Sequence, residues 1–318
     1  MAKQAKGMKS VTNLIFETTY GTMPSTGTWY RQPINKNALT GKQNLITTNT
    51  ITGRRDMTEP GIGEMDASGQ LELPLDTRNI GNILKGIFGA PTTTAGTTEG
   101  TYKHVFTVGD EIPSLTVEKG FPDISLFFQY TGTKFNKLSL TAQVGNNETT
   151  YTVDTMASNE TEVKTTAASS PTSLQLTRFN NVNAAVKEGG TALATCRKMQ
   201  LDINNNLDGD TYCLNGSSIR PSINEGQCEV TGSIETLFED DTQLQKAMNS
   251  TETSLELTFT RDNASLTFSI PEVILERATP SISGPKGITQ TLNYRGYYAD
   301  DKGNSIITVT LINDVATY

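Results

Sequence analysis

The chain has 318 residues, with 34 acidic against 26 basic side chains and a formal net charge of −8, which argues against a protein that grips nucleic acid through Lys and Arg. No run approaches the roughly 20 apolar residues of a membrane span, and no apolar segment follows the lysines of the first ten residues as in a signal peptide. Three cysteines, at positions 196, 213 and 228, lack CxxC spacing and favour reduced thiols over disulfides or zinc.

In chain order, the first long feature is an irregular stretch from about residue 21 to residue 61. It contains Pro24, Pro33 and Pro60 among many Gly, Asn and Thr residues. Loops of this length inside compact domains are usually functional or disordered. A second irregular stretch, residues 157–171, is rich in Ser, Thr and Ala and is typical of a linker.

Two short helices are predicted. Asp76 could cap a helix over residues 77–88, whose isoleucines and Leu84 share one face, and Gly89 would end it. Asp240 or Asp241 could cap a second helix through Met248, with Leu244, Ala247 and Met248 facing inward.

Strands are predicted wherever apolar and polar residues alternate, because this period places one face on a core. The alternating segments are residues 115–118, 138–141, 255–260, 266–270 and 307–311.

One short passage occurs twice. It reads GEMDASGQLE at residues 63–72 and GQCEVTGSIE at residues 226–235. Gly63 and Gly69 match Gly226 and Gly232, and each copy precedes one of the predicted helices. Such a repeat predicts two duplicated β units, over residues 1–175 and 176–318.

The chain carries little of the chemistry that catalysis needs. His104 is the only histidine, and its neighbours indicate a strand position, so a His-dependent triad is not expected. Neither a phosphate-binding loop nor a dinucleotide fingerprint is complete. We therefore expect no enzyme activity and no cofactor.

A weak calcium candidate comprises Asp202, Asn204, Asn206 and Asp208. Counted from Asn204, a glycine falls at the sixth position, but the twelfth position lacks the bidentate glutamate of a calcium loop. A polar hairpin turn explains the same residues, and we expect no metal.

Several passages together resemble a known family. They are ETTYGTMP at residues 17–24, SGQLE at 68–72, ILKGIFG at 83–89, YTGTKFN at 130–136 and LDINNNL at 201–207. In their order and spacing they resemble the tail tube protein, or major tail protein, of long-tailed bacteriophages, over nearly the whole chain.

The resemblance implies an all-β fold with minor α: two tail-tube-like β-sandwich or barrel units, each with one short flanking helix. It implies a virion protein without catalytic activity, assembled in the host cytoplasm into stacked rings that form the conduit for DNA ejection. The implied partners are other copies of the chain, a tape measure protein in the lumen, passing double-stranded DNA that is not bound specifically, and a tail terminator, distal tail protein or sheath. No membrane partner is implied.

Two units per chain would let three chains supply six units. We therefore favour a homotrimeric, pseudo-hexameric ring, with a hexamer of two-domain chains left open. Stacking contacts between rings are expected in the long loop of residues 21–61, and the candidate residues are Trp29, Arg31, Arg54, Arg55 and Asp56. Acidic and hydroxylated strand faces are expected to line the lumen.

Two other functions remain open at this point. A baseplate or secretion-tube ring protein would share the fold but would not polymerise indefinitely. A carbohydrate-binding β-sandwich would need an exposed aromatic platform. Trp29 is the only tryptophan, and a cluster of Tyr294, Tyr297 and Tyr298 is explained equally well by packing.

Overall fold

A computed structural model describes residues 4–145, 147–282, 284–299 and 305–318. It confirms an all-β fold with minor α. The strands of residues 1–175 are β1 (Val11–Phe16), β2 (Tyr30–Arg31), β3 (Lys36–Asn37), β4 (Thr40–Ile46), β5 (Gly61–Pro74), β6 (Thr92–Ala95), β7 (Tyr102–Thr107), β8 (Leu115–Phe121), β9 (Leu126–Gln143), β10 (Thr150–Ala157), β11 (Asn159–Val163) and β12 (Thr172–Ser173).

The strands of residues 176–318 are β13 (Ala184–Glu188), β14 (Thr191–Ala192), β15 (Cys196–Asn204), β16 (Glu229–Leu237), β17 (Thr253–Arg261), β18 (Ala264–Leu275), β19 (Thr289–Gly296) and β20 (Thr308–Asn313). The α-helices are α1 (Ile80–Phe88) and α2 (Thr242–Met248), and short 3₁₀ turns occupy Gly7–Lys9, Pro122–Ile124 and Asn181–Asn183.

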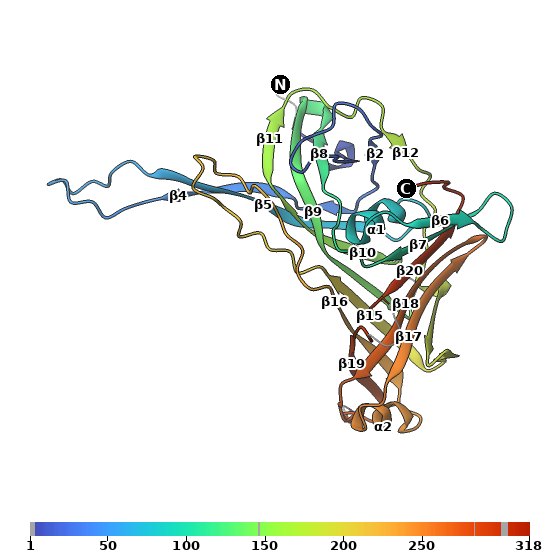
Figure 1. Ribbon diagram of the computed structural model, residues 1–318. Coiled ribbons are helices and arrows are strands. Elements are labelled where there is room, and N and C mark those ends of the chain that lie inside the picture. Colours follow the sequence, from blue (N-terminus) through green and yellow to red (C-terminus); the bar gives the residue numbers. More distant parts are fainter. Residues whose placement is uncertain (1–3, 146, 283, 300–304) are drawn as a thin grey trace.

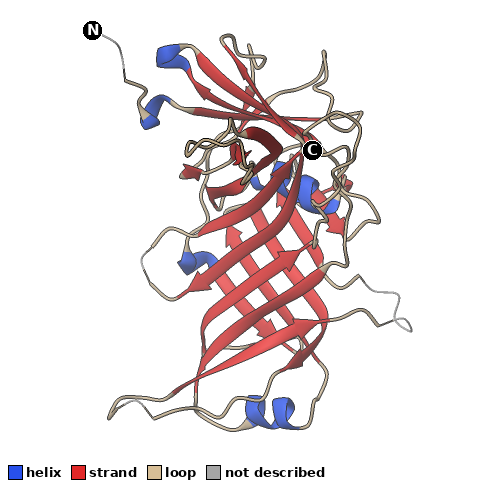
Figure 2. Ribbon diagram, turned by 90° about the vertical axis from the view of Figure 1, so that its left-hand side faces the viewer, coloured by secondary structure: helices blue, strands red, loops and turns tan. Residues whose placement is uncertain are grey.

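One long antiparallel sheet runs through both halves of the chain. At one end β3 and β4 both pair with β5. The order then continues through β10, β9, β15, β16 and β19 to the end of β18. Two outer sheets pack beside it. The first holds β2, β1, β8, β9 and β11, and the second holds β13, β17, β18, β20 and β7. In Figure 1 the first outer sheet lies at the top, and Figure 2 shows the strands of the layers below it crossing.

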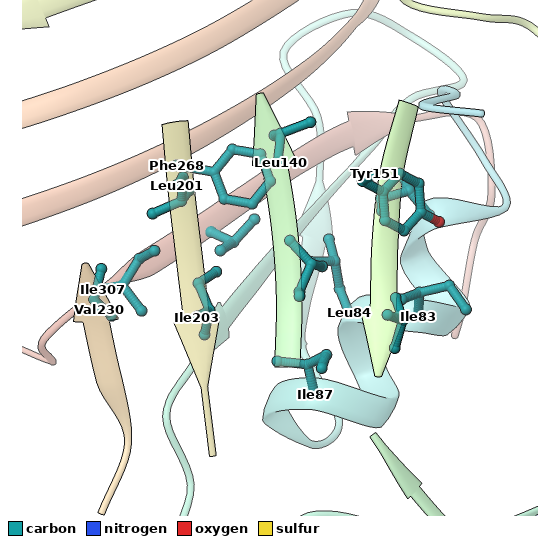
Figure 3. Close-up of a cluster of buried hydrophobic side chains, with 14 of the residues drawn as sticks. Ile83, Leu84, Ile87, Leu140, Tyr151, Leu201, Ile203, Val230, Phe268 and Ile307 are labelled. Atoms are coloured by element: carbon teal, nitrogen blue, oxygen red, sulfur yellow. The ribbon is translucent and has the colours of Figure 1, made fainter. Parts of the chain in front are cut away.

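The predicted alternation forms the core. Leu255, Leu257 and Phe259 of β17 are buried while the residues between them are not. Helix α1 covers the apolar face of the long sheet, and Figure 3 shows its Ile83, Leu84 and Ile87 beneath strands that carry Leu140 and Leu201. This burial, at roughly 1.5–3 kcal/mol for each fully buried large apolar side chain, ties the two halves into one core.

Both predicted helices are present. Asp76 accepts hydrogen bonds from the backbone N–H groups of Asn79 (2.9 Å) and Ile80 (3.0 Å), and α1 ends at Gly89 with φ at 99°. Asp240 accepts a bond from the N–H of Thr242 at the start of α2. Within α2, Ala247 is buried, but Met248 is 44% exposed, so its predicted inward position is wrong.

The same strand-pairing scheme occurs in both halves. The pairs β1–β8, β8–β9, β9–β11, β9–β10, β5–β10 and β4–β5 correspond in turn to β13–β17, β17–β18, β18–β20, β18–β19, β16–β19 and β15–β16, all antiparallel. A register shift lies between Leu115 and Val117 of β8, and another lies between Thr253 and Leu255 of β17. These two bulges hold the same place in their hairpins.

The repeated glycines also share an environment. A Cβ on Gly69 would lie 2.3 Å from the carbonyl oxygen of Ala38, and one on Gly232 would lie 2.0 Å from that of Gln200. Such distances leave no room for a side chain, so the facing strand requires glycine at both places.

Two features depart from the predicted organisation. The stretch of residues 157–171 is not simply a linker, because Asn159–Val163 forms strand β11 and pairs with β9. Its polar residues hid the strand. In addition, β7 of the first half pairs with β20 of the second, so the outer sheet of one half contains a strand from the other. His104 lies on β7, fully buried, with its ring nitrogens near Thr93 Oγ1 and the carbonyl oxygen of Val315.

Candidate assembly surfaces

The face of the long sheet that is turned away from α1 is polar and carries both signs of charge. Its acidic side chains are Asp66, Glu72, Asp154, Asp202, Glu229 and Glu235, and its basic ones are Lys36, Lys42, Lys134, Lys137, Lys198 and Arg295. Hydroxyl and amide side chains fill the positions between them. The six carboxylates equal the six cations in number.

Several cations on this face are paired with carboxylates. Lys134 lies 2.6 Å from Glu225, and Lys137 lies 3.5 Å from Asp202. Arg295 is bonded to Glu229 across 3.1 Å. The lysine partner lowers the pKa of Glu225 although burial alone would raise it. The face is therefore polar, and three of its six basic side chains are neutralised in place by ion pairs.

A hairpin arm projects from the body (Figure 1). It consists of β4, the first part of β5 and the connecting residues 47–60. Five large exposed apolar side chains lie here: Leu45 (67%), Ile46 (55%), Ile51 (97%), Met57 (72%) and Ile62 (72%). Near the tip, Arg54 forms a 2.6 Å ion pair with Asp56. Exposed apolar residues at this density are typical of a contact surface.

The base of the arm is held by residues 205–228, which connect β15 to β16 and which we call the brace loop. The N–H of Met65 donates to the carbonyl oxygen of Ser218 (2.8 Å). The hydroxyl of Tyr212 donates to the carbonyl oxygen of Met65 (2.8 Å). A loop of the second half thus fixes the direction of the arm of the first half.

Arg220 is the centre of this contact. Its guanidinium donates to the carbonyl oxygens of Gly209 (2.7 Å) and Ala157 (3.1 Å) and to the carboxylate of Asp66 (2.6 Å). It also lies over the ring of Tyr212, 5.1 Å from its centroid. Arg220 is only 8% exposed, so its charge depends on these partners.

The two ends of the long sheet are open within the described residues. At one end β3 and β4 pair with β5 alone. Their outward groups are held by side chains: the Gly41 N–H donates to Glu160 (2.8 Å), and the Leu39 carbonyl accepts from Tyr130 and Lys119. At the other end, residues 276–282, which follow β18, form no strand.

A β-walled assembly needs a long sheet with open ends and a projecting arm. A family model described as phage tail tube protein matches residues 7–296. The chain belongs to this family. Tail tube proteins are structural components of the virion tail that assemble into a tube. No curated protein matches the chain. Neither helix found in the described residues has the length or apolar content that crossing a membrane requires.

The five stacking candidates of the tail tube protein lie in two places. Arg54, Arg55 and Asp56 lie near the tip of the arm, all exposed. Arg31, on β2, donates to Asn13 in the body, and the Trp29 carbonyl accepts from the N–H of Thr172. The structure therefore does not bring Trp29 and Arg31 together with the tip residues.

Among the calcium candidates of the tail tube protein, the structure brings Asn204 and Asn206 together, since the side-chain amide of Asn204 donates to Asn206 Oδ1 (2.7 Å). Asp202 and Asn204 lie on the polar face of β15, where Asp202 is paired with Lys137. Asn206, with φ at 45°, begins the brace loop, and Asp208 bonds to Asn224. Within the part of the chain that the structure describes, no group of three or more His, Cys, Asp or Glu side chains is placed to hold a metal.

Sequence reasoning missed the brace loop as a partner of the arm. The residues concerned, Asp66, Tyr212 and Arg220, lie far apart in sequence and match no motif. A weak signal was available, since Arg220 stands alone in a polar loop that otherwise lacks cations. An isolated arginine beside tyrosine and glycine residues often makes structural backbone contacts of this kind.

Replacing Arg220 with Ala is expected to destabilise the tail tube protein by about 3 kcal/mol, because it leaves two buried carbonyls without donors. The arm should also lose its fixed direction. Thermal unfolding and hydrogen exchange at residues 61–67 would measure both effects.

The control is Lys164→Ala. Lys164 pairs with Glu162 on the surface, with the two side chains 73% and 52% exposed, and exposed pairs contribute only about 0–1 kcal/mol. Equal melting temperatures and equal exchange for the two variants would contradict the assigned role of Arg220.

Proposed function

We propose that the chain forms closed rings, that the rings stack into the tail tube, and that genomic DNA passes through the bore during ejection into the host. The observation that carries this proposal is the long sheet, which has one apolar face packed against α1 and the outer sheets and one polar face. An open sheet edge leaves backbone groups unpaired, and closing a ring of identical copies pairs all of them.

The polar face of the long sheet is the proposed wall of the bore. Three of its six cations, Lys134, Lys137 and Arg295, are held by carboxylates. Firm binding of DNA needs free Lys and Arg that displace counterions from phosphates. A wall with as many carboxylates as cations offers little such grip, so duplex DNA could slide along it. A tape measure protein would occupy the same bore before ejection.

We further propose that residues 1–175 and 176–318 are two copies of one structural unit. Six corresponding strand pairs, two matching bulges and the crowded glycines at Gly69 and Gly232 support this inference. Each unit contributes four strands to the long sheet when β3 and β4 are counted as one interrupted strand. Three chains would then supply six units, so we favour a homotrimeric ring with pseudo-sixfold symmetry.

The unequal surroundings of the two units would limit the symmetry to threefold. The arm projects freely from the first unit, whereas the corresponding brace loop of the second unit lies against its own chain. The tips of the arms, with Arg54, Arg55 and Asp56, are the proposed contacts to the next ring. A tail terminator, a distal tail protein or a sheath would bind the ends or the outside of the tube.

Negative-stain microscopy of the purified chain, combined with mass measurement of single particles, tests this function. We expect annular particles with the mass of three chains and hollow filaments built from them. Rings of six equivalent chains would reject the trimer. Monodisperse single chains at high concentration would reject ring assembly altogether, and rings that never lengthen would favour a baseplate-type ring protein.

A further inference from the structure

The chain contains one complete junction between its own two units. Strand β9 pairs with β15, so that Ser139 lies opposite Asp202 and Leu140 opposite Leu201. The brace loop that follows β15 then lies against Asp66 and the Ala157 carbonyl of the first unit. The junction thus consists of one strand pair and one loop contact.

The corresponding strand positions can be located at the open ends of the sheet. In β9, two outward residues precede Leu138, which packs in the core. After β18, two outward residues likewise precede Ala278, which packs against the same core, so Ala278 corresponds to Leu138. Thr279 follows Ala278 as Ser139 follows Leu138, so Thr279 corresponds to Ser139 of the junction. Thr279 is exposed.

The receiving strand is located in the same way. The Ala38 carbonyl approaches Gly69 as the Gln200 carbonyl approaches Gly232, so β3 and β4 correspond to β15. Thr40 comes two residues after Ala38, as Asp202 comes two residues after Gln200, so Thr40 corresponds to Asp202. Thr40 is exposed, at the open edge of the sheet.

The loop contact also has a counterpart that no other described part of the chain covers. In the second unit Glu229 and Gly296 hold the positions that Asp66 and Ala157 hold in the first. Around Arg220 these first-unit positions are covered by the brace loop. In the second unit they border an open cleft of about 890 Å³ between β7, β16 and β19, which Cys228 and Tyr298 also line.

We propose that neighbouring copies join by repeating the in-chain junction. The segment of residues 277–282 of one copy adds to the outer edge of β3 and β4 of the next, with Thr279 opposite Thr40. The arm of that next copy then lies in the cleft beside Glu229. This inference rests on the proposed ring assembly and specifies its lateral contact.

The arm is the occupant because it is the counterpart of the brace loop. The carbonyl oxygens of Asn44 and Asn206 approach Gly63 and Gly226, so both connections leave the sheet at the same place. Arg54 and Arg55 of the arm supply positive charge, as Arg220 does in the brace loop. Glu229, 42% exposed on its side chain, is the acidic group at this position, and an arm arginine would share it with Arg295.

Strand addition requires a local exchange of hydrogen bonds. The backbone groups of Leu39 and Gly41 that would face the incoming strand are held by Tyr130, Lys119 and Glu160. Opposite Gly41, the carbonyl oxygen of Ala278 would take over the bond from the Gly41 N–H, and Glu160 would turn aside. Pro280, opposite Leu39, has no N–H, so the Leu39 carbonyl would keep its bonds from Tyr130 and Lys119.

The first test joins Thr40→Cys with Thr279→Cys in a chain that also carries Cys213→Ser. Opposed residues of this non-hydrogen-bonded kind lie about 4.5 Å apart between Cα atoms, which suits a disulfide. Burial raises the pKa of Cys196 and of Cys228 to about 11, so these native thiols should react slowly at pH 8. Oxidation should give covalent dimers and trimers, separated on denaturing gels without reductant.

The matched control moves one cysteine two residues along, in Thr40→Cys with Ser281→Cys, and should form at least fivefold less covalent product. If rings form but the two pairs cross-link equally, the proposed register is wrong while ring assembly stands. If no rings form with the parent chain, the proposed function itself fails.

The second test reverses charge in the cleft. Glu229→Arg should raise the concentration needed for ring assembly at least tenfold, and adding Arg54→Glu with Arg55→Glu should restore it. Circular dichroism would check that each variant keeps its fold. Unchanged assembly of Glu229→Arg, or no recovery in the triple variant, would overturn the placement of the arm in the cleft.

Discussion

The double variant Ile51→Asp, Met57→Asp is expected to abolish tube growth while leaving the chains folded. Both side chains lie on the arm, 97% and 72% exposed, so their loss does not disturb the core. If they are buried when rings stack, each contributes about 2 kcal/mol, and a carboxylate in their place would have to be desolvated without a partner. Because every ring contributes several arms, the penalty multiplies along the tube.

Filament lengths in negative stain and pelleting by centrifugation would measure this loss. Val182→Asp is the matched control, since Val182 is an apolar residue of the body that is also 77% exposed and belongs to a short 3₁₀ turn. It should leave the filaments unchanged. Long filaments from the double variant would remove the arm from the stacking contact.

The second large effect is expected from Gly69→Ala and Gly232→Ala. Each new Cβ would lie 2.3 Å or less from a backbone carbonyl oxygen of the facing strand. Backbone atoms of a paired strand cannot move aside without breaking ladder bonds, so each variant should lose about 3 kcal/mol of unfolding free energy. Thermal melting would show a decrease of roughly 5–10 °C for each.

Gly61→Ala, in the same strand as Gly69, is the control because the nearest atoms to its Cβ lie 4.0 Å away. Its melting temperature should stay within about 2 °C of the parent. Similar losses at Gly69 and Gly232 would support the equivalence of the two units. A parent-like Gly232→Ala would show that this strand pair is looser than its counterpart.

Local patterns predicted the local elements well. The helix after Asp76, its end at Gly89 and the alternating strands around Leu257 and Leu138 all depend on neighbours within a few residues. In these elements the apolar side chains recur with the period of the helix or the strand, so the pattern can be seen in a single sequence.

Long-range features could not be predicted in this way. Strand β9 runs for 18 residues through two sheets, and regular alternation extends only over its C-terminal part, residues 137–143, because the two parts of the strand pack on different layers. Strand β11 is short and polar, as edge strands often are. The contact of Arg220 with Asp66 joins residues that only the completed fold brings together, so no local pattern encodes it.

The pairing of β9 with β15 has a kinetic consequence. Two units on one polypeptide meet at an effective concentration set by their covalent link, in the millimolar range for short connections, however dilute the protein is. Under the proposed trimer, half of the lateral contacts would then exist before any two molecules collide. Closing a circle would take three encounters instead of six, and the nucleation of a tail would depend much less steeply on how much protein the infected cell has made.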